Sequence, residues 1–163
     1  MRKTIDIFVA NVGERTKAER KEIFLYFIDG AVRPDTTFAF NTIHGNSAAM
    51  GGVHKVMEDA AYKGVTQSNL TYIIVGDGFG EISQRIATQA YSQAEMERKP
   101  VCVLYRTDRT TDHPEWAEKF LQDVRPRDIV NYEEKPWREG SYADDAASKA
   151  FGWYCDKIER PLR

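Results

Sequence analysis

One stretch of this 163-residue chain constrains its fold more than any other. Residues 72–75, Y-I-I-V, are uniformly apolar or aromatic, and G-D-G follows them directly, with Asp77 between the two glycines. A strand without alternating polar residues is typical of the centre of a parallel sheet, where helices cover both faces. Because helical spacing of apolar residues begins near Phe79, the stretch predicts a buried strand, a tight turn and a helix.

Shorter apolar segments predict the other strands. Residues 4–10 alternate between polar and apolar side chains, and residues 23–28 and 36–43 are largely apolar. Since short connections separate these three segments, we expect them to form an antiparallel meander. Two further strands are expected at residues 101–105 and 129–132.

Helices are expected at residues 46–62, 79–98, 114–124 and 144–158, where apolar residues follow helical spacing. Gly64 stands where a glycine would end the first of them. The sequence contains no repeat or linker, so we expect a single domain over residues 1–163. That domain is expected to be α/β, with a mixed sheet of five to six strands, the meander joined to parallel strands, flanked by helices.

Composition narrows the classes of function. The formal net charge is −2, so the chain has no global basic field that would attract nucleic acid. No apolar run approaches the ~20 residues that span a bilayer, and Asp6 interrupts the apolar N-terminal segment, so we expect neither a membrane partner nor a signal peptide. Cys102 and Cys155 lie in apolar surroundings, which indicates a reduced, cytoplasmic protein rather than a disulfide scaffold.

The order of these elements resembles that of the ribonuclease H-like superfamily, of the ribonuclease HI type. The motif I-I-V-G-D-G is similar to the end of the family's fourth strand, with Asp77 at its aspartate. Residues 129–150 are similar to the family's last strand, loop and helix, with Asp144 at a second aspartate. The segment G-N-S-A-A-M resembles the start of the first helix, with Asn46 at an asparagine that contacts the minor groove of an RNA/DNA hybrid.

The sequence departs from the family's four catalytic carboxylates at two positions. Ala10, followed by Asn11, stands at the aspartate of the first strand, and Ala49 stands at the glutamate of the first helix. Two-metal hydrolysis needs anionic oxygen ligands for both ions. The resemblance therefore implies that Asp77 and Asp144 are remnants of the catalytic and metal site, holding weakly bound Mg²⁺ or Mn²⁺ at most.

We therefore expect a ribonuclease H-like domain that has lost two-metal catalysis and acts by binding an RNA/DNA hybrid or a protein partner. Basic residues near the family's basic segment and one tryptophan in a polar loop are the expected contacts, besides the asparagine of the first helix. The candidate nucleic-acid-binding residues are Asn46, Arg98, Lys99, Arg106, Arg109 and Trp137.

Two other functions stay open. A divergent magnesium-dependent ribonuclease H-type nuclease would recruit other carboxylates, such as Asp6, Glu58 or Asp145. A Rossmann-like nucleotide- or nucleoside-binding protein would explain the extra strand at residues 101–105 better. Its ligand would lie at the strand ends near residues 76–80.

Overall fold

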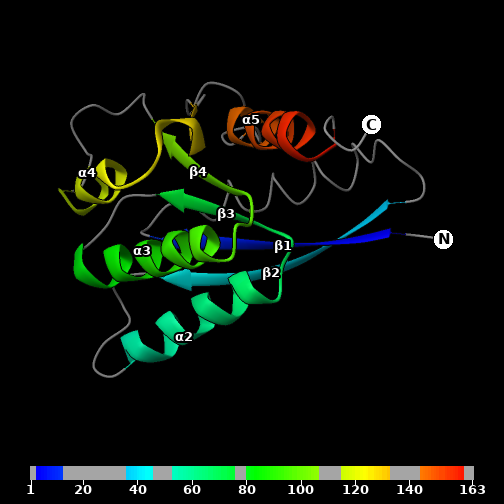
Figure 1. Cartoon of the computed structure of the whole chain (residues 1–163). Helices are drawn as coiled ribbons and strands as arrows, with labels where there is room; N and C mark the ends of the chain where they lie inside the picture. The colour runs from blue at the N-terminus through cyan, green and yellow to red at the C-terminus, as the bar shows by residue number, and fades with distance from the viewer. Residues whose placement is uncertain are drawn as a thin grey trace.

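The structure is a computed structural model that describes residues 3–12, 36–45, 53–75, 80–106, 115–132 and 144–159. The strands are β1 (Lys3–Val12), β2 (Thr36–Gly45), β3 (Leu70–Val75), β4 (Val101–Arg106) and β5 (Ile129–Tyr132). The helices are α2 (Val53–Thr66), α3 (Gly80–Met96), α4 (Glu115–Gln122) and α5 (Asp144–Tyr154), with a 3₁₀ turn η1 (Pro126–Asp128) and a π-helical turn η2 (Cys155–Glu159). From β2 onward, strands and helices alternate around one sheet (Figure 1).

The five strands of the described residues are all parallel, in the spatial order β2-β1-β3-β4-β5. Ile7 of β1 pairs with Phe40 of β2 on one side and with Leu70 of β3 on the other. Parallel neighbours need crossover connections, and α2, α3 and α4 lie on three of them. The expected α/β class, with a five-stranded sheet flanked by helices, is confirmed, and so is the strand expected at residues 101–105, which is β4.

The expected antiparallel meander is wrong. Its first and third segments are β1 and β2, which pair in parallel from Lys3 with Thr36 to Val12 with Gly45. Its middle segment, residues 23–28, lies outside the described residues. Alternating side chains show which residues share a face, but they are the same for either strand direction, so the sequence pattern left the direction open. The ribonuclease H-like topology, which includes the meander, is not confirmed.

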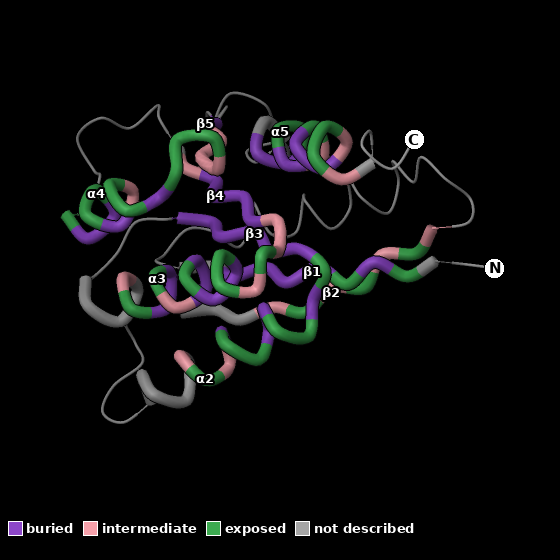
Figure 2. Tube along the Cα trace, viewed as in Figure 1, coloured by how far each residue is buried: buried purple, intermediate pink, exposed green. Residues whose placement is uncertain are grey.

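Helices cover both faces of the sheet, with α2, α3 and α4 on one face and α5 on the other (Figure 1). The side chains of β3 are all buried, as Figure 2 shows for the centre of the sheet. Ile73 and Val75 pack with α2, α3 and α4, whereas Tyr72 and Ile74 pack with α5. The prediction that residues 72–75 form a central parallel strand is therefore confirmed.

Gly64 lies inside α2 and does not end it, so the expected cap at this position is wrong. The helix continues to Thr66, and a Cβ atom on Gly64 would overlap the ring of Phe8 in β1. The glycine is therefore needed for the close approach of helix and strand rather than for a turn.

The other strands and helices expected on described residues agree with the structure within a few residues, and α2 (Val53–Thr66) corresponds to the helix expected at 46–62, whose first seven residues lie outside the described residues. The strand expected at 129–132 is β5, and the helices expected at 79–98 and 114–124 are α3 and α4. The last expected helix, 144–158, is α5 followed by η2. None of the helices in the described ranges combines the length and apolar character that crossing a bilayer requires. Both cysteines are free thiols.

Candidate functional site

The carboxyl ends of the parallel strands meet at one edge of the sheet, called here the carboxyl edge. Val12 of β1 pairs with Gly45 of β2 and with Val75 of β3, which in turn pairs with Tyr105 of β4. Helices α2, α3 and α5 begin on the side toward which the strand arrows point (Figure 1). This edge therefore collects strand ends together with the positive ends of helix dipoles.

The strand order reverses at the carboxyl edge between β1 and β3. The chain leaves β1 for β2 on one side, whereas it leaves β3 for α3 and β4 on the other. Connections that diverge in this way open a crevice outside the strand ends, and open parallel sheets bind their ligands there.

The two predicted carboxylates belong to segments that adjoin the carboxyl edge. Asp77 lies outside the described residues, two positions after Val75 and so within the connection from β3 to α3. Asp144 is the first residue of α5. Ala10, at the family's first aspartate, is fully buried in the core beneath α2 and α3. Within the part of the chain that the structure describes, no three histidine, cysteine or acidic side chains gather in a way that could hold a metal ion.

The candidate nucleic-acid contacts do not form one continuous group. Arg98 and Lys99 precede β4 at the opposite edge of the sheet, where the strands begin and which we call the amino edge, whereas Arg106 ends β4 at the carboxyl edge. The six residues of β4 separate them by roughly 20 Å, at about 3.3 Å per residue. Residues close in sequence are here far apart because a strand runs between them. The other three candidates, Asn46, Arg109 and Trp137, lie outside the described residues.

Lys99 joins the end of α2 to the start of β4. Its Nζ donates to the carbonyl oxygens of Val65, at 3.0 Å, and Thr66, at 2.8 Å, and lies 3.3 Å from a carboxylate oxygen of Glu97. A cation at the last carbonyls of a helix is stabilising. Hydrogen bonds to its carboxylate lower the pKa of Glu97 and keep it charged, and the bond from Gln93 has the largest effect on this pKa. The Lys99 ammonium thus has an evident structural role.

Arg98, two residues after the end of α3, has an unusual backbone conformation. Its φ angle is 55°, in the left-handed region that favours glycine. The amide of Lys99 donates to the Ala94 carbonyl and that of Arg98 to the Glu95 carbonyl, which makes a Schellman motif with Arg98 at the position usually held by glycine. An arginine there costs about 1 kcal/mol. The sequence signal is the proline at position 100, which follows such ends often.

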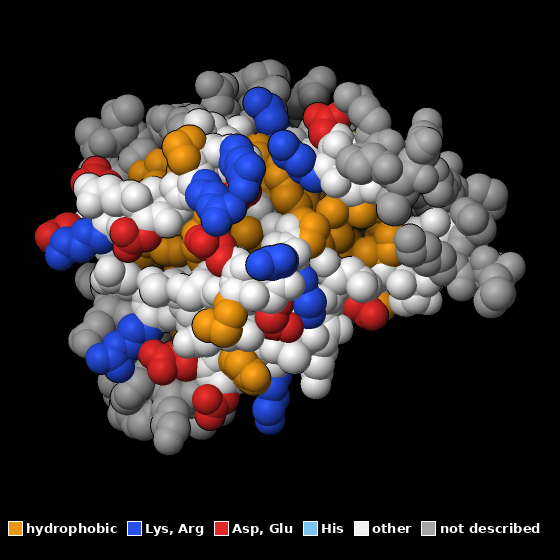
Figure 3. All heavy atoms as spheres, viewed as in Figure 1, with side chains coloured by type: hydrophobic (Ala, Val, Ile, Leu, Met, Phe, Trp, Pro, Cys, Tyr) orange, Lys and Arg blue, Asp and Glu red, His pale blue; other side chains and the backbone are white. Residues whose placement is uncertain are grey.

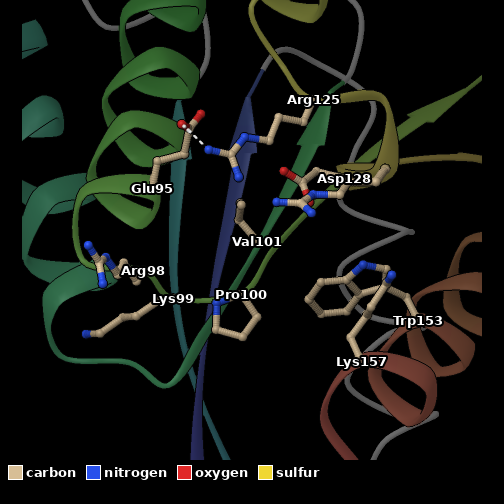
Figure 4. A pocket seen from close by; sticks show the side chains of 10 residues that line it. Glu95, Arg98, Lys99, Pro100, Val101, Arg125, Asp128, Trp153 and Lys157 are labelled. Atoms are coloured by element: carbon tan, nitrogen blue, oxygen red, sulfur yellow. Dashed lines mark ion pairs between the residues drawn. The ribbon is translucent and has the colours of Figure 1, made fainter. Parts of the chain in front are cut away.

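A pocket of about 590 Å³ opens at the amino edge, between the end of α3, η1 and the end of α5 (Figure 4). We call it the amino-edge pocket. Its basic lining residues are Arg98, Lys99, Arg125, Arg127 and Lys157, and its acidic ones are Glu95 and Asp128. Figure 3 shows lysine and arginine side chains gathered on this face, in a chain whose formal net charge is −2. Sequence reasoning singled out the first two and missed the other three, which follow in two later segments.

Tyr91 fixes the η1 wall of this pocket to α3. Its hydroxyl donates to Asp128 Oδ2 at 2.7 Å and accepts from the Arg125 amide at 3.0 Å. Burial and the neighbouring carboxylate raise the pKa of Tyr91 above its ordinary value, whereas the Arg125 amide opposes the shift, so the donor is retained at neutral pH. The Arg125 guanidinium lies 3.5 Å from Glu95. These contacts place Arg125 and the η1 turn beside the end of α3.

Comparison with protein families and curated proteins identifies no relative of this chain. No protein-family model matches the sequence, and no curated protein matches it. Function therefore rests on the strand order and on the chemistry of the two sheet edges.

Proposed function

We propose that the protein binds a nucleotide or nucleoside at the carboxyl edge, between the ends of β1 and β3. The observation that carries this proposal is the strand order β2-β1-β3-β4-β5, which reverses between these two strands. In doubly wound parallel sheets, ligands bind outside the carboxyl ends at such a reversal.

The sequence at this reversal has the chemistry that such a ligand needs. The chain passes from β3 to α3 through G-D-G-F, and α3 begins at Gly80. Glycines allow a ligand to approach the backbone, and the start of a long helix attracts phosphate. Asp77 would accept hydrogen bonds from ribose hydroxyls or bind a cation that accompanies the phosphates. The spacing G-x-G-x-G differs from the dinucleotide fingerprint, so a single nucleotide is favoured.

A second candidate function is binding of an RNA/DNA hybrid or a protein partner by a ribonuclease H-like domain without catalysis. One observation favours it: α5 begins with Asp144 on the side of the edge at which β3 ends, two residues before Asp77. The parallel pairing of β1 with β2 speaks against it, because the family's first strands are antiparallel. We rank it second, together with its active form, a divergent magnesium-dependent nuclease.

Two measurements with ATP, AMP and adenosine, each with and without Mg²⁺, test the proposal: calorimetric titration gives the Kd, and thermal unfolding gives the melting temperature, Tm. A ligand at a hundred times its Kd stabilises by about 2.7 kcal/mol, so the Tm should rise by roughly 5–10 °C. Asp77→Asn should weaken binding about tenfold, since it removes a charged acceptor. Asp59→Asn, at an exposed position on α2, is the matched control.

The proposal is wrong if no nucleotide or nucleoside changes the Tm, or if the two variants bind equally well. Cleavage of an RNA/DNA hybrid with Mg²⁺ or Mn²⁺, abolished by Asp77→Asn, would instead establish the nuclease. Binding of the hybrid without cleavage, and without a nucleotide effect, would establish the second candidate.

A further inference from the structure

We propose that the amino-edge pocket binds a small organic phosphate, a phosphate monoester with a flat apolar body. This site is separate from the one proposed at the carboxyl edge, since β4 runs between the two edges. Its volume of about 590 Å³ is within the range of pockets for small ligands, roughly 300–1,000 Å³.

Positive charge that has no ion pair among the described residues supplies the recognition of phosphate. Arg98, Arg127 and Lys157 line the pocket from three different elements and have no ion pair with any described residue. The two other cations of the pocket are paired with glutamates. Among the described lining residues, three cations thus stand against one acid, Asp128, an excess that matches the charge of about −2 on a phosphate monoester.

Apolar groups between these cations supply the place for the body of the ligand. Figure 4 shows Pro100 and Val101 between the end of α3 and the indole of Trp153. The ring of Trp153 is held in place by an edge-on contact with Tyr72, with the ring centroids 5.5 Å apart. A flat apolar group would therefore meet a preformed surface.

The indole of Trp153 is a largely buried part of the pocket wall. Trp153 is only 8% exposed, and its buried N–H has no acceptor among the residues that the structure describes. The ring of Trp153 lines the pocket, so its indole resonance reports on a ligand that binds there.

The strained backbone conformation of Arg98 also indicates a binding site at this pocket. Its left-handed conformation would be relaxed by glycine, yet the chain carries a long cationic side chain there, at the edge of the pocket. Strained residues of this kind concentrate at binding sites. Arg98→Gly should therefore weaken ligand binding while it raises stability, which separates a binding role from a structural one.

A small ligand fits this pocket better than a nucleic-acid strand does. A strand needs a basic groove that follows several nucleotides, on the order of four or more. The next basic residue after this pocket along β4, Arg106, lies at the other edge of the sheet. Along β4, therefore, the described basic residues do not form a continuous groove.

Titration of the ¹⁵N-labelled protein with phenyl phosphate, observed by NMR, tests the proposal. The chain has three tryptophans, and Trp→Phe variants assign their indole N–H resonances. Phenyl phosphate should shift the Trp153 indole resonance in a saturable way. Arg127→Gln and Lys157→Gln should each raise the Kd about tenfold, since each removes a hydrogen bond to a charged group. Lys149→Gln, at an exposed position on α5 outside the pocket, should leave the Kd unchanged.

Several results would overturn the proposal. One is an indole resonance of Trp153 that does not move up to millimolar phenyl phosphate, and another is an equal Kd for Lys157→Gln and Lys149→Gln. If inorganic phosphate binds as tightly as phenyl phosphate, the apolar body of the ligand contributes nothing to binding, and the proposal of a phosphate monoester with a flat apolar body is wrong. A short oligonucleotide that displaces phenyl phosphate and binds more tightly would replace a small ligand with nucleic acid. Asp77→Asn should not change the Kd for phenyl phosphate, whatever its effect on nucleotides.

Discussion

The two edges of the sheet offer binding sites of different kinds. At the carboxyl edge, strand order and helix direction define where a ligand would lie, and the chemistry comes from a glycine-rich connection that holds Asp77. At the amino edge, strand order does not indicate where a ligand would lie. The candidate site there consists of side chains in and next to α3, η1, α5 and η2, around Trp153. The candidate site at the carboxyl edge is thus indicated by the sheet topology, and the candidate site at the amino edge by the chemistry of its side chains.

This difference explains which site the sequence could indicate. A strand followed by G-D-G is contiguous, so the carboxyl edge could be predicted from one short stretch. The amino-edge pocket joins Arg98 to Arg127 and Lys157, which come together only because β4 and β5 are neighbours and α5 crosses back over them. No spacing in the sequence marks such a set, since its members belong to separate elements.

The first prediction concerns the scaffold that both edges share. Gly64→Val should destabilise the protein by about 3 kcal/mol, because its side chain would overlap the Phe8 ring and push α2 off the sheet. The Tm, measured by circular dichroism, should fall by roughly 6–12 °C. Gly152→Ala is the matched control, since a Cβ atom there meets nothing within 4 Å, and it should stabilise α5 by about 0.5–1 kcal/mol. Equal Tm values for the two variants would mean that α2 does not pack closely on β1.

The second prediction concerns α5, which extends from one edge to the other. Burial raises the pKa of Tyr72 and of Cys102, both beneath this helix, well above the ordinary values of 10.0 and 9.0. Above pH 9–10 the unfolded chain therefore loses these protons while the folded protein keeps them. Stability should be constant below this range and fall as the pH rises through it, by up to about 1.4 kcal/mol per pH unit for each group.

Urea unfolding between pH 8 and 11 measures this dependence. Tyr72→Phe should flatten the alkaline slope, although it costs about 1 kcal/mol at pH 7 because the 2.7 Å hydrogen bond to the Ala150 carbonyl is lost. A slope that the variant leaves unchanged would show that Tyr72 is not the group that titrates.

The third prediction, with the smallest effect on stability, separates the two edges. Arg98→Gly should raise the free energy of unfolding by about 1 kcal/mol, since the left-handed φ angle of 55° becomes unstrained. The same variant should bind phenyl phosphate less tightly and bind nucleotide as the wild type does. Arg98→Ala is the control, because it removes the cation and keeps the strained backbone. If Arg98→Gly and Arg98→Ala are equally stable, the backbone strain at this position is absent.

Much of the architecture could be predicted from the sequence. The uniform apolar run of β3, the proline that opens the α4 segment and the amphipathic spacing of α5 each carry a local physical signal. Strand direction could not be predicted, because β1 and β2 show the same alternation in a hairpin and in a crossover. The cap expected at Gly64 was wrong because a glycine needed for close packing and one needed for a turn look alike in sequence. Tertiary neighbours decide such cases.

Chemical-shift mapping of the backbone amides with Mg²⁺-ATP tests the central claim most directly. If the reversal of strand order marks the binding site, the largest perturbations should occur at the ends of β1 and β3, around Val12 and Val75, and in residues 76–80, which connect β3 to α3 in the sequence. The indole resonance of Trp153, at the opposite edge, should stay in place at concentrations that saturate this site. Perturbations centred on the amino edge, or none at all, would contradict the proposal that the carboxyl edge binds a nucleotide.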